Sequence, residues 1–249
     1  MPIHPASYPS PAGRSKFLIE VCVSTIEDAI MAAELRADRL ELSSALETDG
    51  VTPSLGMLQE VLGAVSIPVV TLIRLRSGDF VYDRREVKAM LHDAVLAMEA
   101  GSQAIAVGCL TAERRVDFPA MRMFAEAVGG KNCVCHRAID RCADLKLAVD
   151  ELCELGYRRA LTSGGRINAI AGADSLHELR CRVADQLEIL VAGGVSPGNL
   201  SELILRTGCD QFHGSFRKQT QPESPPRLDP IRLANAIYLR DSLPPKSLC

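Results

Sequence analysis

The stretch FLIEVCVSTIEDAIMAAELRADRLELS, residues 17–43, contains the pattern that decides the fold. Its first seven residues form a short apolar run with a high β propensity, which is typical of a buried strand. Ser24, followed three residues later by Glu27, predicts a capping box at the start of a helix. A second β-rich run, RLELS at residues 39–43, follows this helix. The stretch therefore predicts a strand–helix–strand unit of the kind found in parallel sheets.

The same alternation continues to the end of the chain. Further strands are predicted at residues 69–74, 104–108, 133–137, 159–162, 187–191 and 210–213. The predicted helices begin at Thr52-Pro53 and then occupy residues 83–100, 119–128, 144–155, 174–183, 197–206 and 230–240. An open doubly wound sheet would carry a glycine-rich fingerprint after the first strand, and Cys22-Val23-Ser24 does not provide one. The alternation therefore predicts an α/β fold, a single closed (β/α)8 barrel.

Length and composition fit one such barrel, because a chain of 249 residues matches the usual size of this fold. We expect residues 1–16, which are rich in Pro and Ser and lack a signal-peptide core, to form a disordered arm. Residues 17–240 then form the barrel and residues 241–249 a C-terminal tail. The nine cysteines are odd in number and irregularly spaced, which indicates reduced thiols in a cytoplasmic protein.

The composition argues against two classes of partner. A net charge of −3 provides no basic field for nucleic acid or for an anionic membrane surface. Trp is absent and aromatic residues make up 4% of the chain, which leaves few platforms for base stacking. No apolar run approaches the roughly 20 residues that a membrane span needs. We therefore expect no nucleic-acid partner and no membrane partner.

Ionisable side chains accumulate on strands that should be buried, near the ends where such barrels carry their sites. Glu20 and Cys22 share one face of the first strand because alternate residues point the same way. A buried charge costs several kcal/mol unless it is paired, so convergence of many charges predicts a site. A layer of Glu–Arg pairs lining the barrel is the structural alternative. The candidate site residues are Glu20, Glu41, Arg74, Arg76, Asp79, His136, Arg137, Asp140 and His213.

These residue types suggest roles. Four of them suit general acid–base chemistry, namely Glu20, Glu41, His136 and Asp140. The arginines suit a carboxylate or a phosphate, which a guanidinium binds in a bidentate manner. Asp79 and His213 are further candidate ligand-binding residues.

Two glycine pairs follow successive strands, within Ser163-Gly164-Gly165 and at Gly193-Gly194. Backbone N–H groups in such turns bind anions, so the pairs predict that a small anionic ligand is held there. Tight strand-to-helix turns without a ligand are the alternative interpretation.

Two cysteines are candidate metal ligands. Cys22 shares a face with Glu20, and Cys109 lies just past the fourth strand. Cys133 and Cys135 lie on the strand face opposite His136, so we expect both to pack against the helices.

Several of these residues belong to blocks whose order and spacing resemble the CutC family of copper homeostasis proteins, over residues 18–217. The resemblance implies a TIM barrel, a cytoplasmic location, a role in copper homeostasis and assembly as a homodimer or higher homo-oligomer. The matching blocks are Glu20-Val21-Cys22, Arg39-Leu40-Glu41-Leu42, Thr52-Pro53-Ser54, IRLRSGDF at 73–80, Gly108-Cys109-Leu110, HRAID at 136–140, LTSGG at 161–165, AGGV at 192–195 and Phe212-His213.

One departure from the family pattern concerns copper. The family commonly has a second cysteine where this chain has Ser43, and copper(I) prefers thiolate to a hydroxyl. Copper binding at Cys22 without a second cysteine at residue 43 is therefore one hypothesis. The alternative is a barrel enzyme that acts on a small anionic metabolite, including phosphorylated ones. A third hypothesis is a site for a hard metal ion at Glu20, Glu41 and His136.

Overall fold

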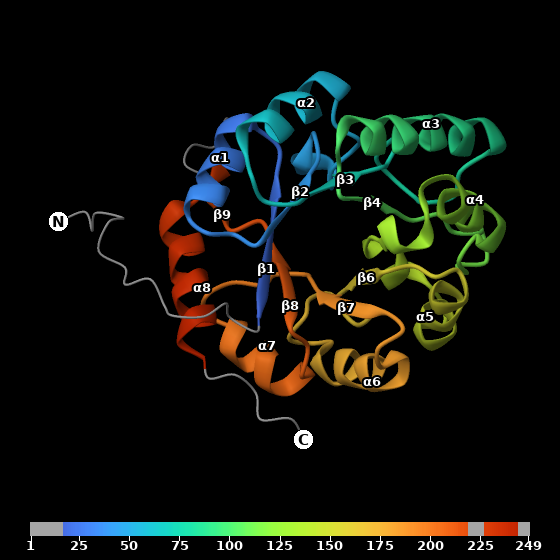
Figure 1. The fold of residues 1–249 in the computed structure, drawn as a ribbon. Coiled ribbons are helices and arrows are strands. Elements are labelled where there is room, and N and C mark those ends of the chain that lie inside the picture. The colour runs from blue at the N-terminus through green and yellow to red at the C-terminus, as the bar shows by residue number, and fades with distance from the viewer. Residues whose placement is uncertain (1–16, 219–226, 244–249) are drawn as a thin grey trace.

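The structure, a computed structural model, describes residues 17–218 and 227–243. Eight parallel strands form a closed barrel in which each strand pairs with its neighbours in sequence and the eighth pairs with the first (Figure 1). This confirms the predicted (β/α)8 barrel. The strands are β1 (Leu18–Val23), β2 (Arg39–Leu42), β3 (Val69–Leu72), β4 (Ala104–Val107), β5 (Cys133–Cys135), β6 (Arg159–Thr162), β7 (Glu188–Val191) and β8 (Gln211–Gly214).

Helices surround the barrel (Figure 1). No helix among the described residues is long and apolar enough to cross a membrane. A two-stranded antiparallel hairpin, β9 (Arg217–Lys218) with β10 (Arg227–Leu228), was not predicted. The helices are α1 (Ile26–Glu34), α2 (Leu55–Ala64), α3 (Arg84–Ala100), α4 (Phe118–Val128), α5 (Leu145–Glu154), α6 (Ala173–Val183), α7 (Leu200–Thr207) and α8 (Pro230–Ser242), with 3-10 turns η2 (Leu46–Thr48), η3 (Gly130–Asn132) and η4 (Arg137–Arg141).

Two predicted helix starts were wrong. The N-cap of α1 is Thr25, whose Oγ1 accepts the N–H of Asp28 at 3.1 Å, so the Ser24 capping box does not form. Helix α2 begins after Ser54 rather than at Thr52, because the Thr52 hydroxyl accepts the backbone N–H of Arg74 at 2.9 Å. The start of α7 also moved, from residue 197 to Leu200, and the other boundaries shifted by at most two residues. The predicted arm at 1–16 and the tail beyond residue 243 lie outside the described residues, and α8 continues two residues past the predicted end of the barrel.

The barrel interior is divided between apolar and charged residues. Cys133 and Cys135 pack in the larger apolar cluster, which joins the strands to the helices, while Val134 points inward, as strand alternation predicted. A smaller apolar cluster fills the interior on β3 to β7 and consists of Val70, Leu72, Ala104, Ala106, Val134, Leu161, Leu190 and Ala192. Charged residues of the barrel lie on β1 and β2, namely Glu20, Arg39 and Glu41, and a further ion pair joins Arg159 on β6 to Glu188 on β7.

Strand register brings these charged residues together. Glu20 on β1 lies opposite Arg39 on β2 and opposite His213 on β8, while Cys22 lies opposite Glu41. A predicted alternative, a layer of charged pairs, is present near the amino ends of the strands. There Arg39 ion-pairs with Glu20 and donates to Gln211 at 3.0 Å. This layer lies below the site and supports it.

Candidate functional site

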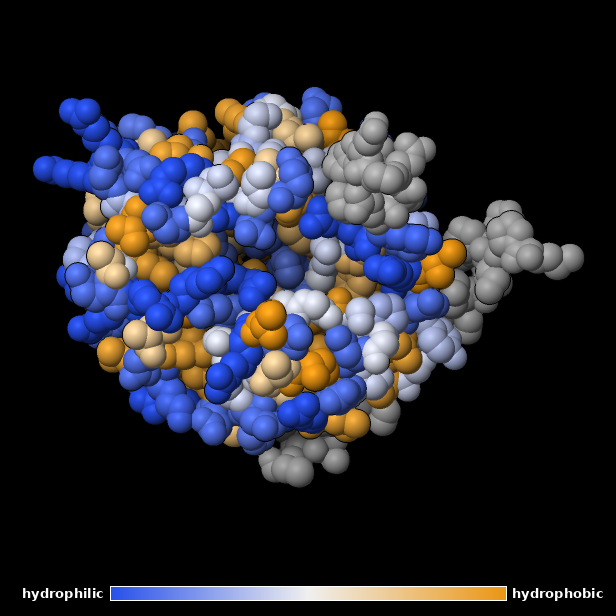
Figure 2. Space-filling model, turned by 180° about the vertical axis from the view of Figure 1, so that it is seen from behind, coloured by the Kyte–Doolittle hydropathy of each residue, from blue (hydrophilic) through white to orange (hydrophobic). Residues whose placement is uncertain are grey.

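A cavity of about 1250 Å³ lies at the carboxyl ends of the strands, where the fold predicts a site. The space-filling view shows one face hollowed near its centre and bordered largely by hydrophilic residues (Figure 2). Three predicted site residues on β1, β2 and β8 line the cavity, namely Cys22, Glu41 and His213. On the other side it is lined by His136, Arg137 and Asp140. The two groups form separate walls of the same space.

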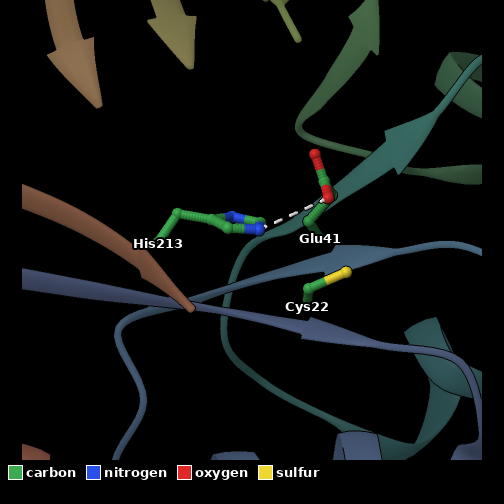
Figure 3. A group of neighbouring side chains, drawn as sticks. All are labelled: Cys22, Glu41 and His213. Carbon is green, nitrogen blue, oxygen red and sulfur yellow. Dashed lines mark ion pairs between the residues drawn. The ribbon is translucent and has the colours of Figure 1, made fainter. Parts of the chain in front are cut away.

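The first wall holds a compact set of metal-ligating groups. One ligand atom each from Cys22, Glu41 and His213 lies within 4.8 Å of the other two (Figure 3). The Nε2 atom of His213 is 3.8 Å from Oε2 of Glu41. The sulfur of Cys22 lies 3.8 Å from the hydroxyl of Ser43. Within the described residues this is the one group of three or more His, Cys, Asp or Glu side chains close enough to hold a metal ion.

Glu20 orients the histidine of this cluster. Its Oε1 atom accepts a hydrogen bond from Nδ1 of His213 at 2.8 Å. Burial acts to raise the pKa of Glu20, but the Arg39 guanidinium and His213 outweigh it and hold that pKa well below its usual range. A carboxylate bonded to one ring nitrogen fixes the orientation of a histidine and leaves the other nitrogen for a metal. Nε2 of His213 accordingly faces Glu41.

Burial and neighbouring charges set the protonation of the cluster. Burial raises the pKa of the Cys22 thiol and of the Glu41 carboxyl, and the Glu41 charge raises that of Cys22 further. For His213 burial acts in the opposite sense, but the carboxylates of Glu41 and Glu20 and the Cys22 contact raise its pKa well above its usual value. The cluster therefore carries protons on Cys22 and His213, which a metal ion must displace.

His136 on the second wall is neutral, whereas His213 is protonated. Burial, with the nearby charge of Arg74, lowers its pKa to about 3. Its Nδ1 atom accepts the backbone N–H of Ala138 at 3.2 Å, so the neutral ring carries its proton on Nε2. Nε2 is buried and has no partner among the described residues. The ring fits beside Gly108, where a Cβ would lie 2.7 Å from it. This arrangement suits a hydrogen-bond donor better than a general base.

The arginines after β3 are engaged by the protein. Nη1 of Arg74 donates to the carbonyls of Asp49 and Gly50, both at 3.0 Å, and Nη2 donates to the carbonyl of Gly78 at 2.9 Å. Its guanidinium also lies over the Phe80 ring, 4.8 Å from the ring centre. Arg74 thus connects the segment after β2 to the loop after β3 at the cavity mouth.

Arg76 makes ion pairs with Asp79 at 3.0 Å and with Glu86 at 2.6 Å. Because Glu86 belongs to the capping box of α3, this pair attaches the loop to the helix. Arg76 and Asp79 therefore bond to each other at the rim.

The first glycine pair already holds a carboxylate from the chain itself. Asp140 accepts hydrogen bonds from the N–H groups of Ser163 and Gly165, each at 3.0 Å, and Arg137 pairs with its other oxygen at 2.9 Å. Gly164 donates to the Thr162 hydroxyl. The second pair, Gly193 and Gly194, lines the cavity.

The structure does not bring Cys109 into the site. Its side chain belongs to the apolar cluster between strands and helices, and the residue is neither part of the metal-ligating group nor a lining residue of the cavity. His136 likewise lies outside the group that contains Glu41. The structure therefore does not bring together Glu20, Glu41 and His136 as a site for a hard metal ion. The group that it brings together is Cys22, Glu41 and His213.

Comparisons with known proteins agree with the family resemblance described above. The model of the CutC family matches residues 17–218. A CutC family protein of Bacteroides fragilis is 34% identical over 228 residues and covers 90% of each chain. A second, from Caulobacter vibrioides, is 38% identical over 201 residues, which is 81% of this chain and 82% of the relative.

Solved structures show the same fold. CutC of Streptococcus agalactiae superposes with a TM-score of 0.76 at 32% identity, over 80% of this chain and 98% of that one. Phosphoribosylanthranilate isomerase of Thermotoga maritima superposes with a TM-score of 0.61 at 12% identity, over 91% of this chain and 100% of that one. At this identity the second likeness shows the barrel fold alone.

Proposed function

Because the chain belongs to the CutC family, we propose that it takes part in copper homeostasis and binds a copper ion at Cys22, Glu41 and His213. The observation that carries this proposal is the close approach of the three ligand atoms, all within 4.8 Å of one another. Copper(I) is a soft ion that prefers thiolate, and imidazole is a common copper ligand. Cys22 and His213 are then the principal ligands.

The neighbours of the cluster support the same assignment. Glu20 holds the ring of His213 by Nδ1, as carboxylates commonly do for metal-bound histidines. Ser43 occupies the position of the second family cysteine, and its hydroxyl is a poor ligand for copper(I). Glu41 and His213 supply the donors that a second thiolate would otherwise provide.

Copper binding must release protons, since Cys22 and His213 are protonated without the ion. Copper affinity therefore rises with pH in the neutral range. Each displaced proton contributes roughly a tenfold change in apparent affinity per pH unit.

The experiment is an anaerobic copper(I) competition titration against a chromogenic chelator. We expect one tightly bound ion in the wild type and loss of tight binding in Cys22→Ala. Cys109→Ala is the matched control, because Cys109 is another buried cysteine and lies outside the cluster. Weak binding by the wild type, or binding that does not depend on Cys22, would contradict the proposal.

We do not propose an enzyme acting on a small anionic metabolite, because Arg74 and Arg76 already bond to groups of the protein. The cytoplasmic location and the homo-oligomeric state stay predictions. Light scattering during size-exclusion chromatography tests the second of these.

A further inference from the structure

Two turns of the barrel each contain a pair of glycines with positive φ angles. The first follows β6 and contains Gly164 and Gly165, with φ angles of 72° and 70°. The second follows β7 and contains Gly193 and Gly194, with φ angles of 96° and 77°. Thr162 and Val191, the last strand residues before these turns, are register partners. The two glycine pairs therefore occupy equivalent positions in neighbouring strand–turn units.

The first turn binds an oxyanion within the structure. The carboxylate of Asp140 lies on the N–H group of Gly165, at 3.0 Å, and Arg137 pairs with it from the other side at 2.9 Å. Backbone N–H groups of such turns bind anions because they present positive partial charge in a concave arrangement. An oxyanion held by this turn and an arginine is thus observed in the chain itself.

The second turn differs in one donor, because the N–H of Ala192, the equivalent of Ser163, donates to the carbonyl of Thr162 at 2.9 Å. The carbonyl of Gly193 accepts the N–H of Ala169, and that of Gly194 accepts the side-chain amide of Asn199, both at 2.8 Å. These bonds fix the turn. The N–H groups of Gly193 and Gly194 have no hydrogen-bond partner in the described part of the chain. Both glycines line the cavity.

The cavity that both glycines line has more cationic than anionic side chains. Within the described ranges, six arginines and four carboxylates line the cavity, although the whole chain has a net charge of −3. Two of these residues bond to Ser163, Arg137 through its guanidinium and Arg166 through its backbone carbonyl. The Ser163 hydroxyl accepts from Arg137 at 3.1 Å and donates to the carbonyl of Arg166 at 2.6 Å. A Cβ on Gly193 would lie 3.0 Å from the Ser163 side chain.

We infer that the N–H groups of Gly193 and Gly194, together with Arg166 and Arg137, form a binding subsite for an oxyanion. The ligand is a small molecule that carries a carboxylate or a phosphate, because both present oxygen atoms that backbone N–H groups and guanidinium groups bind. The cavity of about 1250 Å³ has room for such a molecule. This subsite is distinct from the cluster at Cys22, and the inference does not rest on copper binding.

Nuclear magnetic resonance of the ¹⁵N-labelled full chain tests the inference directly. Inorganic phosphate and acetate are titrated separately, with chloride keeping the ionic strength constant. We expect saturable shifts of the Gly193 and Gly194 amide resonances. The Gly165 amide should not respond, because Asp140 already occupies it. A stronger response to phosphate assigns the subsite to phosphorylated ligands, and a stronger response to acetate assigns it to carboxylates.

Variants separate this subsite from general charge effects. Arg166→Ala should weaken binding about threefold, as expected for an exposed charged contact. Arg180→Ala removes the same charge from an exposed position on helix α6, away from the cavity. This variant should bind phosphate and acetate with the affinity of the wild type. Cys22→Ala should also titrate like the wild type, so failure of the copper proposal would leave this result intact. Absence of saturable shifts at both glycine amides, or an unchanged affinity in Arg166→Ala, overturns the inference.

Discussion

The two walls of the cavity each contain a histidine, and the two histidines differ in protonation. His213, on the wall formed by β1, β2 and β8, lies between Glu20 and Glu41, and their charges raise its pKa. His136, after β5, lies near Arg74, and burial with this positive charge lowers its pKa to about 3. The residue type is the same. The charge of the neighbours decides whether the ring carries a charge.

This difference suggests a division of the cavity by ligand charge. The wall at Cys22 offers anionic and soft donors that suit a cation. The wall at Arg137, together with the turn after β7, offers arginines and N–H groups that suit an anion. The predictions below test each wall separately, from the largest expected effect to the smallest.

Glu20→Gln should lower copper affinity by roughly 10- to 100-fold, the usual effect of removing the hydrogen-bond partner of a metal-bound histidine. The amide no longer provides the charged acceptor that holds Nδ1 of His213. Competition titration with a chromogenic chelator measures the change. Glu188→Gln is the control, because Glu188 belongs to the same charged layer without contacting His213. Equal copper affinities in the wild type and Glu20→Gln would show that Glu20 does not support the metal site.

His136→Gln should remove part of the acid sensitivity of folding. The pKa of His136 is about 3 in the folded protein and about 6.5 in the unfolded chain. Below about pH 6.5 His136 therefore binds a proton in the unfolded chain but not in the folded protein. The stability of the wild type falls as the pH drops through this range. From pH 7 to pH 5 this contributes a loss of about 2 kcal/mol. Urea unfolding at both pH values measures the difference between wild type and variant.

His213 should show the opposite dependence. Because its folded-state pKa is raised, its contribution to stability is present below about pH 6.5 and is lost as pH rises through the folded-state pKa. His213→Gln should therefore lose more stability at pH 5 than at high pH. If both histidine variants changed stability in the same direction with pH, the contrast between the two walls would be wrong.

Asp140→Ala should give the smallest effect, a new phosphate response at the first glycine turn. Removal of the carboxylate frees the N–H group of Gly165, which then resembles that of Gly194. The amide resonance of Gly165 should shift with added phosphate in the variant and stay constant in the wild type. A Gly165 amide that stays silent in a folded variant would show that the two turns are not equivalent.

The barrel and one side of the site could be predicted from sequence because both follow from local periodicity. Strand alternation placed Glu20 with Cys22 on one face of β1. The pairing of Cys22 with Glu41 and of Glu20 with His213 could not be predicted, since it depends on the register between strands and on closure of the barrel.

Residues beyond the strand ends were harder to interpret. Arg74 has the chemistry of an anion ligand, but it bonds to carbonyls of the irregular segment after β2, whose path no periodic pattern encodes. The same holds for Asp140, which reaches the turn after β6 from η4. Arg39 lies two residues before Glu41, so strand alternation places both on one face, but its pairing with Glu20 depends on the register between strands.

X-ray absorption at the copper edge, on protein loaded with one equivalent of copper(I), tests the central claim most directly. The account predicts one sulfur neighbour together with a histidine nitrogen, and loss of the sulfur signal in Cys22→Ala with Cys109→Ala unchanged. A copper site with only nitrogen and oxygen neighbours, or with sulfur neighbours that persist in Cys22→Ala, would contradict it.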